Sequence, residues 1–127
     1  MADSISRLYA AVLDARGGDP ATSRTTRLIR AGLPKAAKKM AEEAVEVTIE
    51  AMHGRSDAVV LESADLIYNL VVLWSISGVQ PEDVWAEMRR REEMMGIAEK
   101  LPKKLLAAAS GNSKVAMLDA GRYVKRR

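Results

Sequence analysis

Apolar side chains recur every three or four positions through most of the chain, which is the period of an amphipathic helix. Stop and start signals divide this pattern into helices. Ser4 can cap a first helix, which ends in the Gly-Gly-Asp-Pro run of residues 17–20, and Thr22 or Ser23 can cap a second, which ends at Gly32. Since no stretch shows the alternation typical of a strand, the sequence predicts an all-α fold.

The next two helices form the centre of the predicted fold. Pro34 suits the first turn of one of them, and Gly78 follows the end of the other. Only a few residues join residues 34–53 to residues 57–77, so these segments are expected to pack as an antiparallel hairpin within a helical bundle. A fifth helix is expected to start at Pro81.

The predicted domain boundary lies after the fifth helix. That helix is expected to end before Pro102, and a short helix over the LLAAA run at 105–109 is expected to follow. We therefore divide the chain into a helical domain, residues 1–98, and a C-terminal extension, residues 99–127, whose structure the sequence does not determine.

Composition excludes several classes of function. The chain has no cysteine, which removes a disulfide framework and a thiolate nucleophile and suits a reducing cytoplasm. The N-terminal residues do not show the basic and apolar regions of an export signal, so a cytoplasmic location is expected. The net charge is +3, and the basic clusters at 89–91 and 122–127 contain few aromatic residues, so they do not favour nucleic-acid binding.

Residues 58–76 are apolar enough to resemble a membrane span. Glu62 and Asp65 interrupt this segment, and each acid would cost about 2.5–3.5 kcal/mol at the centre of a bilayer. We therefore predict a helix buried inside protein, with no membrane partner. One chain of this length has too few helices to cover it, which predicts a homodimer or a higher homo-oligomer. The interface is expected to lie near the candidate active groove of the hairpin, whose residues are given next.

Acidic residues cluster on both helices of the predicted hairpin. On a helical wheel of about 100° per residue, the acids of the first helix fall within roughly a 100° arc. Those of the second form a narrow stripe with Asn69, and apolar residues surround this stripe, so its acids are expected to have no solvated face of their own. The clustered acids are Glu42, Glu43, Glu46 and Glu50 on the first helix, and Glu62 and Asp65 on the second.

Such a cluster favours a bound cation. Two unit charges about 6 Å apart repel by roughly 3 kcal/mol at an effective dielectric constant of 20. Carboxylates without histidine or cysteine select a hard ion, Mg²⁺ or Mn²⁺. The repeated i,i+3 spacing lets each helix present two acids across one groove, which gives the predicted metal ligands Glu43, Glu46, Glu62 and Asp65. The alternative is ion pairing of the acids with nearby lysines or with arginines of the fifth helix.

The pattern ExxE, fifteen residues, then ExxD resembles the all-α nucleoside-triphosphate pyrophosphohydrolases of the MazG type. Within them the chain is most similar to the phosphoribosyl-ATP pyrophosphohydrolase family. The similarity covers about residues 5–91 and includes the stretches LYAAVLDARGGDPATS, GLPKAAKKMAEEAVE and ESADLIYNLVVLW. It implies Mg²⁺-dependent hydrolysis of the α–β phosphate linkage of phosphoribosyl-ATP, giving phosphoribosyl-AMP and pyrophosphate, an early reaction of histidine biosynthesis.

The resemblance also implies roles for individual residues. The four acids would hold metal that bridges the triphosphate, and Glu42 or Glu43 would take the proton of the attacking water. Asn69 would orient Asp65 or contact the substrate; its alternative is a polar core residue. The remaining expected phosphate contacts, whose alternative is a solvated face, are Lys35, Lys38 and Lys39.

Three positions depart from the usual pattern of the family. Arg24 stands where a tyrosine is usual, Ala41 where a glycine is usual, and Asn69 where a histidine is usual. Two other functions therefore stay open. One is a house-cleaning pyrophosphohydrolase that acts on other nucleoside triphosphates with the same metal site. The other is a non-catalytic helical scaffold or regulatory dimer.

Overall fold

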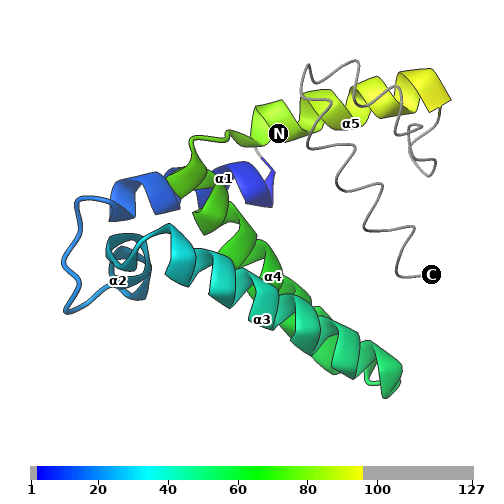
Figure 1. The fold of residues 1–127 in the computed structure, drawn as a ribbon, viewed down its shortest axis with the longest axis horizontal. Coiled ribbons are helices and arrows are strands. Elements are labelled where there is room, and N and C mark those ends of the chain that lie inside the picture. The colour runs from blue at the N-terminus through cyan, green and yellow to red at the C-terminus, as the bar shows by residue number, and fades with distance from the viewer. Residues whose placement is uncertain (1–2, 96–127) are drawn as a thin grey trace, which may run out of the picture. The chain divides into compact units, whose positions relative to one another are not determined.

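The computed structural model describes residues 3–95, and within this range every regular element is a helix (Figure 1). The prediction of an all-α fold is therefore confirmed for the described residues. The helices are α1 (Ser4–Ala15), α2 (Arg24–Ala31), α3 (Leu33–Met52), α4 (Ser56–Ser77) and α5 (Pro81–Met95).

Side-chain caps start the first two helices. The Asp3 carboxylate accepts a hydrogen bond from the Ser6 backbone N–H at 2.7 Å, so Asp3 caps α1 and the prediction of Ser4 as its cap was wrong by one residue. Ser23 caps α2, because its hydroxyl accepts a hydrogen bond from the Thr26 N–H at 3.1 Å. Each bond satisfies an N–H that lacks a partner inside its helix.

The ends of the central helices lie where the glycines predicted them. α3 ends at a His53 cap, and Gly54 then takes a φ of 70°, a left-handed conformation that residues with a Cβ rarely adopt. Gly78, with a φ of 74°, ends α4 in the same way. The chain therefore reverses between α3 and α4 within a few residues.

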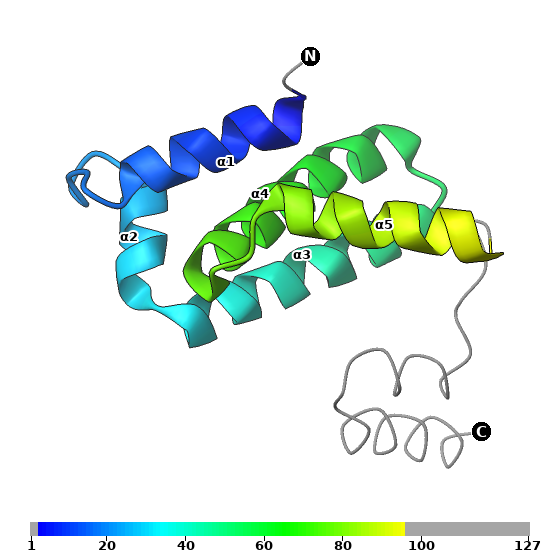
Figure 2. The same cartoon turned by 90° about the horizontal axis from the view of Figure 1, so that it is seen from above.

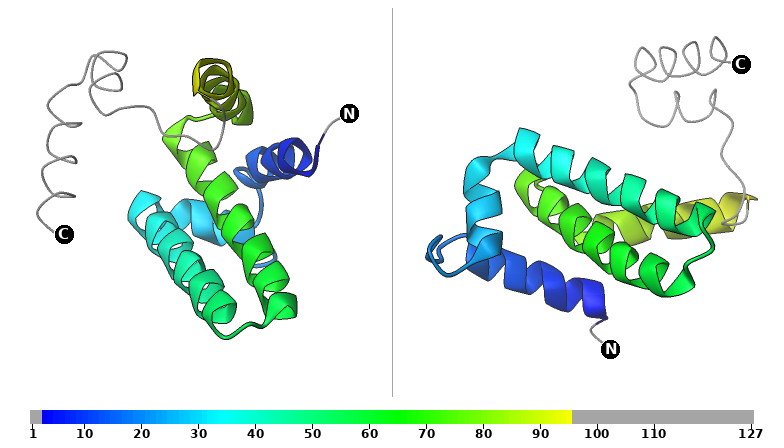
Figure 3. Two further views of the ribbon diagram at one scale, coloured as in Figure 1. Left: turned by 90° about the vertical axis from the view of Figure 1, so that its right-hand side faces the viewer. Right: turned by 90° about the horizontal axis from the view of Figure 1, so that it is seen from below.

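α3 and α4 pack along each other as an antiparallel hairpin, as predicted (Figures 1 and 3). α4 lies between α3 and α1, and α2 crosses the end of the hairpin that is opposite its turn (Figure 2). α1, α2, α3 and α4 all contribute to one small core, which consists of Val12, Leu28, Ala36, Val71 and Val72. This core holds the four helices together around the C-terminal half of α4.

The chain divides into two compact units, Met1–Val84 and Trp85–Arg127, and the division falls inside α5. Within the described part of the second unit, Glu87 forms ion pairs with Arg90 at 2.7 Å and with Arg91 at 2.9 Å. The predicted domain boundary at residues 98–99 and the expected short helix lie outside the described residues.

α4 is only partly covered by the rest of the chain. It is the one helix within residues 3–95 that is long and apolar enough to cross a membrane, yet only 22% of its most apolar stretch is buried. Val60 and Leu61 are 68% and 67% exposed, and Met52 at the end of α3 is 83% exposed. Residues 3–95 of one chain therefore do not bury this helix, and its predicted burial inside protein requires a further surface.

Candidate metal centre

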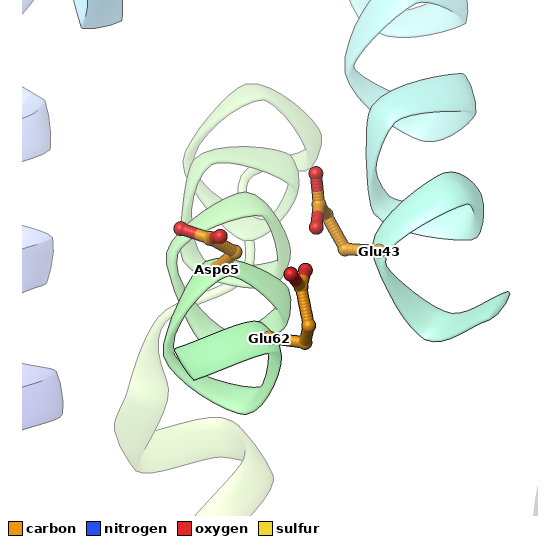
Figure 4. A group of neighbouring side chains, drawn as sticks. All are labelled: Glu43, Glu62 and Asp65. Carbon is orange, nitrogen blue, oxygen red and sulfur yellow. The ribbon is translucent and has the colours of Figure 1, made fainter. Parts of the chain in front are cut away.

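Three carboxylates from the two hairpin helices come together near the middle of α4. Glu43 extends from α3 toward Glu62 and Asp65 on α4 (Figure 4). One oxygen atom of each of these three side chains lies within 4.8 Å of the others. The spacing of acids along the sequence predicted that these three side chains lie together. The fold brings them together, one from α3 and two from α4.

The separation of these oxygens fits a small divalent cation. Oxygens bound to one octahedral Mg²⁺ lie about 2.1 Å from the ion and hence no more than about 4.2 Å apart. The 4.8 Å limit in the structure exceeds this by an amount that side-chain rotation can close. A donor set made only of carboxylates favours Mg²⁺ or Mn²⁺ over zinc.

The charges of the cluster act on one another. Burial and the neighbouring Glu43 carboxyl raise the pKa of Glu62 above its ordinary value, and the charges of Asp65 and Glu46 add to this effect. All of these causes disfavour the ionised form of Glu62. A bound cation would remove this repulsion, so the electrostatics of the cluster agree with a metal site.

Glu46 is not one of the three residues whose oxygens approach so closely. It lies one turn after Glu43 on α3, is exposed, and influences Glu62 through its charge. The structure thus brings together three of the four predicted ligands and leaves Glu46 beside them. Its role as a ligand stays a prediction.

The prediction that the α4 acids have no solvated face was wrong for Asp65 in the single chain. Asp65 is exposed, whereas Glu62 and Glu43 are half-buried. The wheel treated apolar neighbours as buried neighbours, but Leu61 and Ala64 beside these acids are themselves exposed. The cluster therefore lies at the surface of this chain.

Ion pairing with lysines does not account for the acids. Of the three ion pairs among the described residues, one joins Glu50 to Arg55 at 2.7 Å and the other two lie within α5. None includes Glu42, which is exposed, or one of the three clustered carboxylates.

The lysines expected to contact phosphate lie on the first half of α3. Lys39 is half-buried, and the exposed residues are Lys35 and Lys38.

Asn69 is fully buried one turn beyond the cluster. Its Nδ2 donates a hydrogen bond to the backbone carbonyl of Asp65 at 2.8 Å, while its Oδ1 has no partner among the described residues. The amide therefore contacts the helical turn that carries Asp65, which agrees with a role in orienting Asp65. The expected contact between Asn69 and substrate stays a prediction.

A second polar contact near the cluster escaped the sequence analysis. The Tyr68 hydroxyl and the Thr25 hydroxyl are hydrogen bonded at 2.7 Å, and the Arg24 guanidinium lies over the Tyr68 ring, 5.2 Å from its centre. Position 24 already stood out in the sequence, because an arginine stands where the resemblance leads one to expect a tyrosine. Nothing local to Arg24 indicated that its neighbour would be Tyr68.

Comparison with known proteins places the chain. The sequence model of a family described as phosphoribosyl-ATP pyrophosphohydrolase matches residues 5–92. The chain belongs to this family. The matched range contains α1 from its second residue, all of α2 to α4 and most of α5, and therefore every acid of the hairpin.

Relatives in the phosphoribosyl-ATP pyrophosphohydrolase family carry consistent names. Phosphoribosyl-ATP pyrophosphatase 2 of Rhodopseudomonas palustris is 68% identical over 103 residues, which cover 81% of this chain and 79% of the relative. The protein of the same name from Bradyrhizobium diazoefficiens is 66% identical over 106 residues, covering 84% and 79%. Phosphoribosyl-ATP pyrophosphatase of Granulibacter bethesdensis is 46% identical over 108 residues, covering 84% and 68%.

Proposed function

We propose that this protein hydrolyses phosphoribosyl-ATP between its α and β phosphates, releasing phosphoribosyl-AMP and pyrophosphate in histidine biosynthesis. Membership of the family supports this activity, as do relatives that are two-thirds identical and carry the name of the reaction. The observation that carries the proposal within the structure is the convergence of Glu43, Glu62 and Asp65, because a triphosphate is bound and cleaved with the help of divalent cations. The family is one of soluble biosynthetic enzymes, and we place the reaction in the cytoplasm.

The residues of the cluster are proposed to hold Mg²⁺, with Mn²⁺ as a substitute. Glu43, Glu62 and Asp65 supply three carboxylate oxygens within 4.8 Å, and Glu46 adds a fourth carboxylate nearby. When bound, the cation supplies neutralisation of phosphate charge and lowers the pKa of a coordinated water. The protein's part is to fix the carboxylates on two packed helices, so that phosphate and water meet in one orientation.

The other residues expected at the site are one carboxylate and three lysines, and we propose different roles for the two kinds. Glu42 precedes the cluster residue Glu43 directly and is exposed, so it is the carboxylate left to accept a proton from the attacking water, whereas Glu43 is placed to serve as a ligand. The lysines before them on α3 bring positive charge for phosphate oxygens; they are Lys35, Lys38 and Lys39.

The active form is proposed to be a homodimer. Large apolar side chains are exposed along both hairpin helices, and a second copy of the chain is the simplest surface to cover them. The most exposed are Met52, Val60 and Leu61. Sedimentation at micromolar concentration is expected to give a dimer or a larger homo-oligomer, and a fully active monomer would contradict the proposal.

The substrate is tested by a direct comparison. Phosphoribosyl-ATP, ATP, dATP and inosine triphosphate are each incubated with the protein and Mg²⁺, and the products are identified by ³¹P NMR. We expect phosphoribosyl-ATP to give pyrophosphate and phosphoribosyl-AMP far faster than the other substrates react. An inert phosphoribosyl-ATP together with rapid turnover of another triphosphate would instead favour a house-cleaning hydrolase.

A further inference from the structure

Arg24, at the start of α2, contacts an aromatic ring of α4. Its guanidinium lies over the ring of Tyr68 at 5.2 Å from the ring centre, and the Tyr68 hydroxyl is bonded to Thr25 at 2.7 Å. Two consecutive residues at the start of α2 thus contact one aromatic ring of α4. The contact orients the ring and gives the arginine side chain a platform.

The hydrogen-bonding edge of this guanidinium is unused. Stacking on an aromatic ring occupies the face of the group and leaves its N–H donors at the edge. Within residues 3–95 no hydrogen bond or ion pair engages the Arg24 side chain, which is exposed. By contrast, Arg27 on the next turn of α2 donates to the Pro20 carbonyl at 2.7 Å. Among the described residues, the guanidinium of Arg24 is therefore open to a ligand.

The ring that Arg24 contacts belongs to the same helix as two of the clustered carboxylates. Tyr68 follows Asp65 by three residues on α4, which is about 4.5 Å along the helix axis. Because α4 begins at the hairpin turn, Tyr68 lies further from that turn than Asp65 does. Among the described residues, Arg24 forms no ion pair with any of the three clustered carboxylates.

We propose that Arg24 is a substrate-binding residue that takes a phosphate group of phosphoribosyl-ATP. The inference rests on the proposed function, because that substrate carries a triphosphate and, on its phosphoribosyl group, a separate monophosphate. A guanidinium binds a phosphate through two parallel N–H···O bonds, and Arg24 is both preoriented and free to do so.

The test is the steady-state kinetics of Arg24→Ala and Arg24→Lys with phosphoribosyl-ATP and saturating Mg²⁺. The alanine variant is expected to raise KM about tenfold to a hundredfold, the effect of losing a charged hydrogen-bonding group. Lysine keeps the charge and loses the fork, so its KM should fall between the two. Arg30→Ala, which removes an exposed arginine from the last turn of the same helix, is the matched control and should change KM less than twofold.

Two further readouts separate binding from a structural role. The rise in melting temperature caused by Mg²⁺ without substrate should be the same in the wild type and Arg24→Ala, because the arginine does not belong to the metal cluster. Inhibition by pyrophosphate, which contains the β and γ phosphates, narrows down the phosphate that is bound. Weaker inhibition of the alanine variant assigns Arg24 to the β or γ phosphate, and unchanged inhibition with a raised KM assigns it to a phosphate that stays on phosphoribosyl-AMP.

The outcomes are distinct. An active wild type whose KM is unchanged in Arg24→Ala, or is raised equally by Arg30→Ala, overturns the assignment of Arg24 and leaves the proposed function intact. A lower melting temperature with unchanged KM has the same meaning, since it shows only a structural contact. A wild type that does not turn over phosphoribosyl-ATP overturns the proposed function, and the assignment of Arg24 falls with it. If the alanine variant does not fold, the lysine variant decides.

Discussion

Asp65→Asn removes one charge from the cluster while keeping the shape of the side chain. Asp65 and Glu43 place oxygens within 4.8 Å of each other. Two unit charges at that distance repel by about 0.9 kcal/mol in a medium as polar as water and by about 3.5 kcal/mol at an effective dielectric constant of 20. Asp65 is exposed, so the lower value applies. We expect the metal-free variant to be about 1 kcal/mol more stable than the parent.

Thermal unfolding measures this difference. In EDTA and at one fixed protein concentration, the variant is expected to melt roughly 3–5 °C above the parent, the shift that 1 kcal/mol gives in a chain of this size. Mg²⁺ binds only the folded form, so at one hundred times its Kd it should stabilise the parent by about 2.7 kcal/mol. The variant has lost a ligand and should gain much less.

Glu50→Gln is the matched control on α3. Glu50 accepts hydrogen bonds from Arg55 at 3.0 and 2.7 Å and lies outside the cluster. Its neutralisation removes an attraction instead of a repulsion, so the melting temperature in EDTA should stay level or fall, and the response to Mg²⁺ should be unchanged. The reasoning is refuted if Asp65→Asn lowers the melting temperature in EDTA and Mg²⁺ has no effect on the parent.

Two further predictions concern neighbours of Asp65. Burial and Glu43 raise the folded-state pKa of Glu62 above 4.5, so the folded protein holds this proton more readily than the unfolded chain, and metal-free stability should fall as the pH rises from 4.5 through the raised pKa. Melts in EDTA across this pH range check it, and Glu62→Gln should flatten the slope. Asn69→Leu replaces a buried amide whose Oδ1 has no partner among the described residues, so urea unfolding should show a loss of less than about 1 kcal/mol, with reduced turnover of phosphoribosyl-ATP. A larger loss of stability would show that the amide is a structural residue.

Local signals predicted the helices well because each boundary depends on a few adjacent residues. Gly54 and Gly78 take the left-handed conformations expected of them after α3 and α4. The first cap was misplaced by one residue because Asp3 and Ser4 are both good capping residues, and only the geometry shows that the Asp3 carboxylate reaches the Ser6 N–H.

The candidate site could be predicted in part. Two residues three apart on a helix differ by about 60° in direction, so Glu43 can face α4 while Glu46 lies to one side. The helical wheel could not show that Leu61 is exposed, because burial depends on helices from elsewhere in the fold or from another chain. The bond between Thr25 and Tyr68 joins positions 43 residues apart, and no local pattern indicates such a pair.

The assignment of the metal centre is tested most directly by the Mg²⁺ dependence of pyrophosphate release from phosphoribosyl-ATP. The proteins compared are the wild type, Glu62→Gln and Glu50→Gln. We expect EDTA to abolish release by the wild type and Mg²⁺ to restore it. Glu62→Gln should lose most of the activity, and Glu50→Gln, whose partner Arg55 lies outside the cluster, should keep nearly all of it. Full activity of Glu62→Gln, or release that persists in EDTA, would contradict the assignment of the cluster as the metal centre.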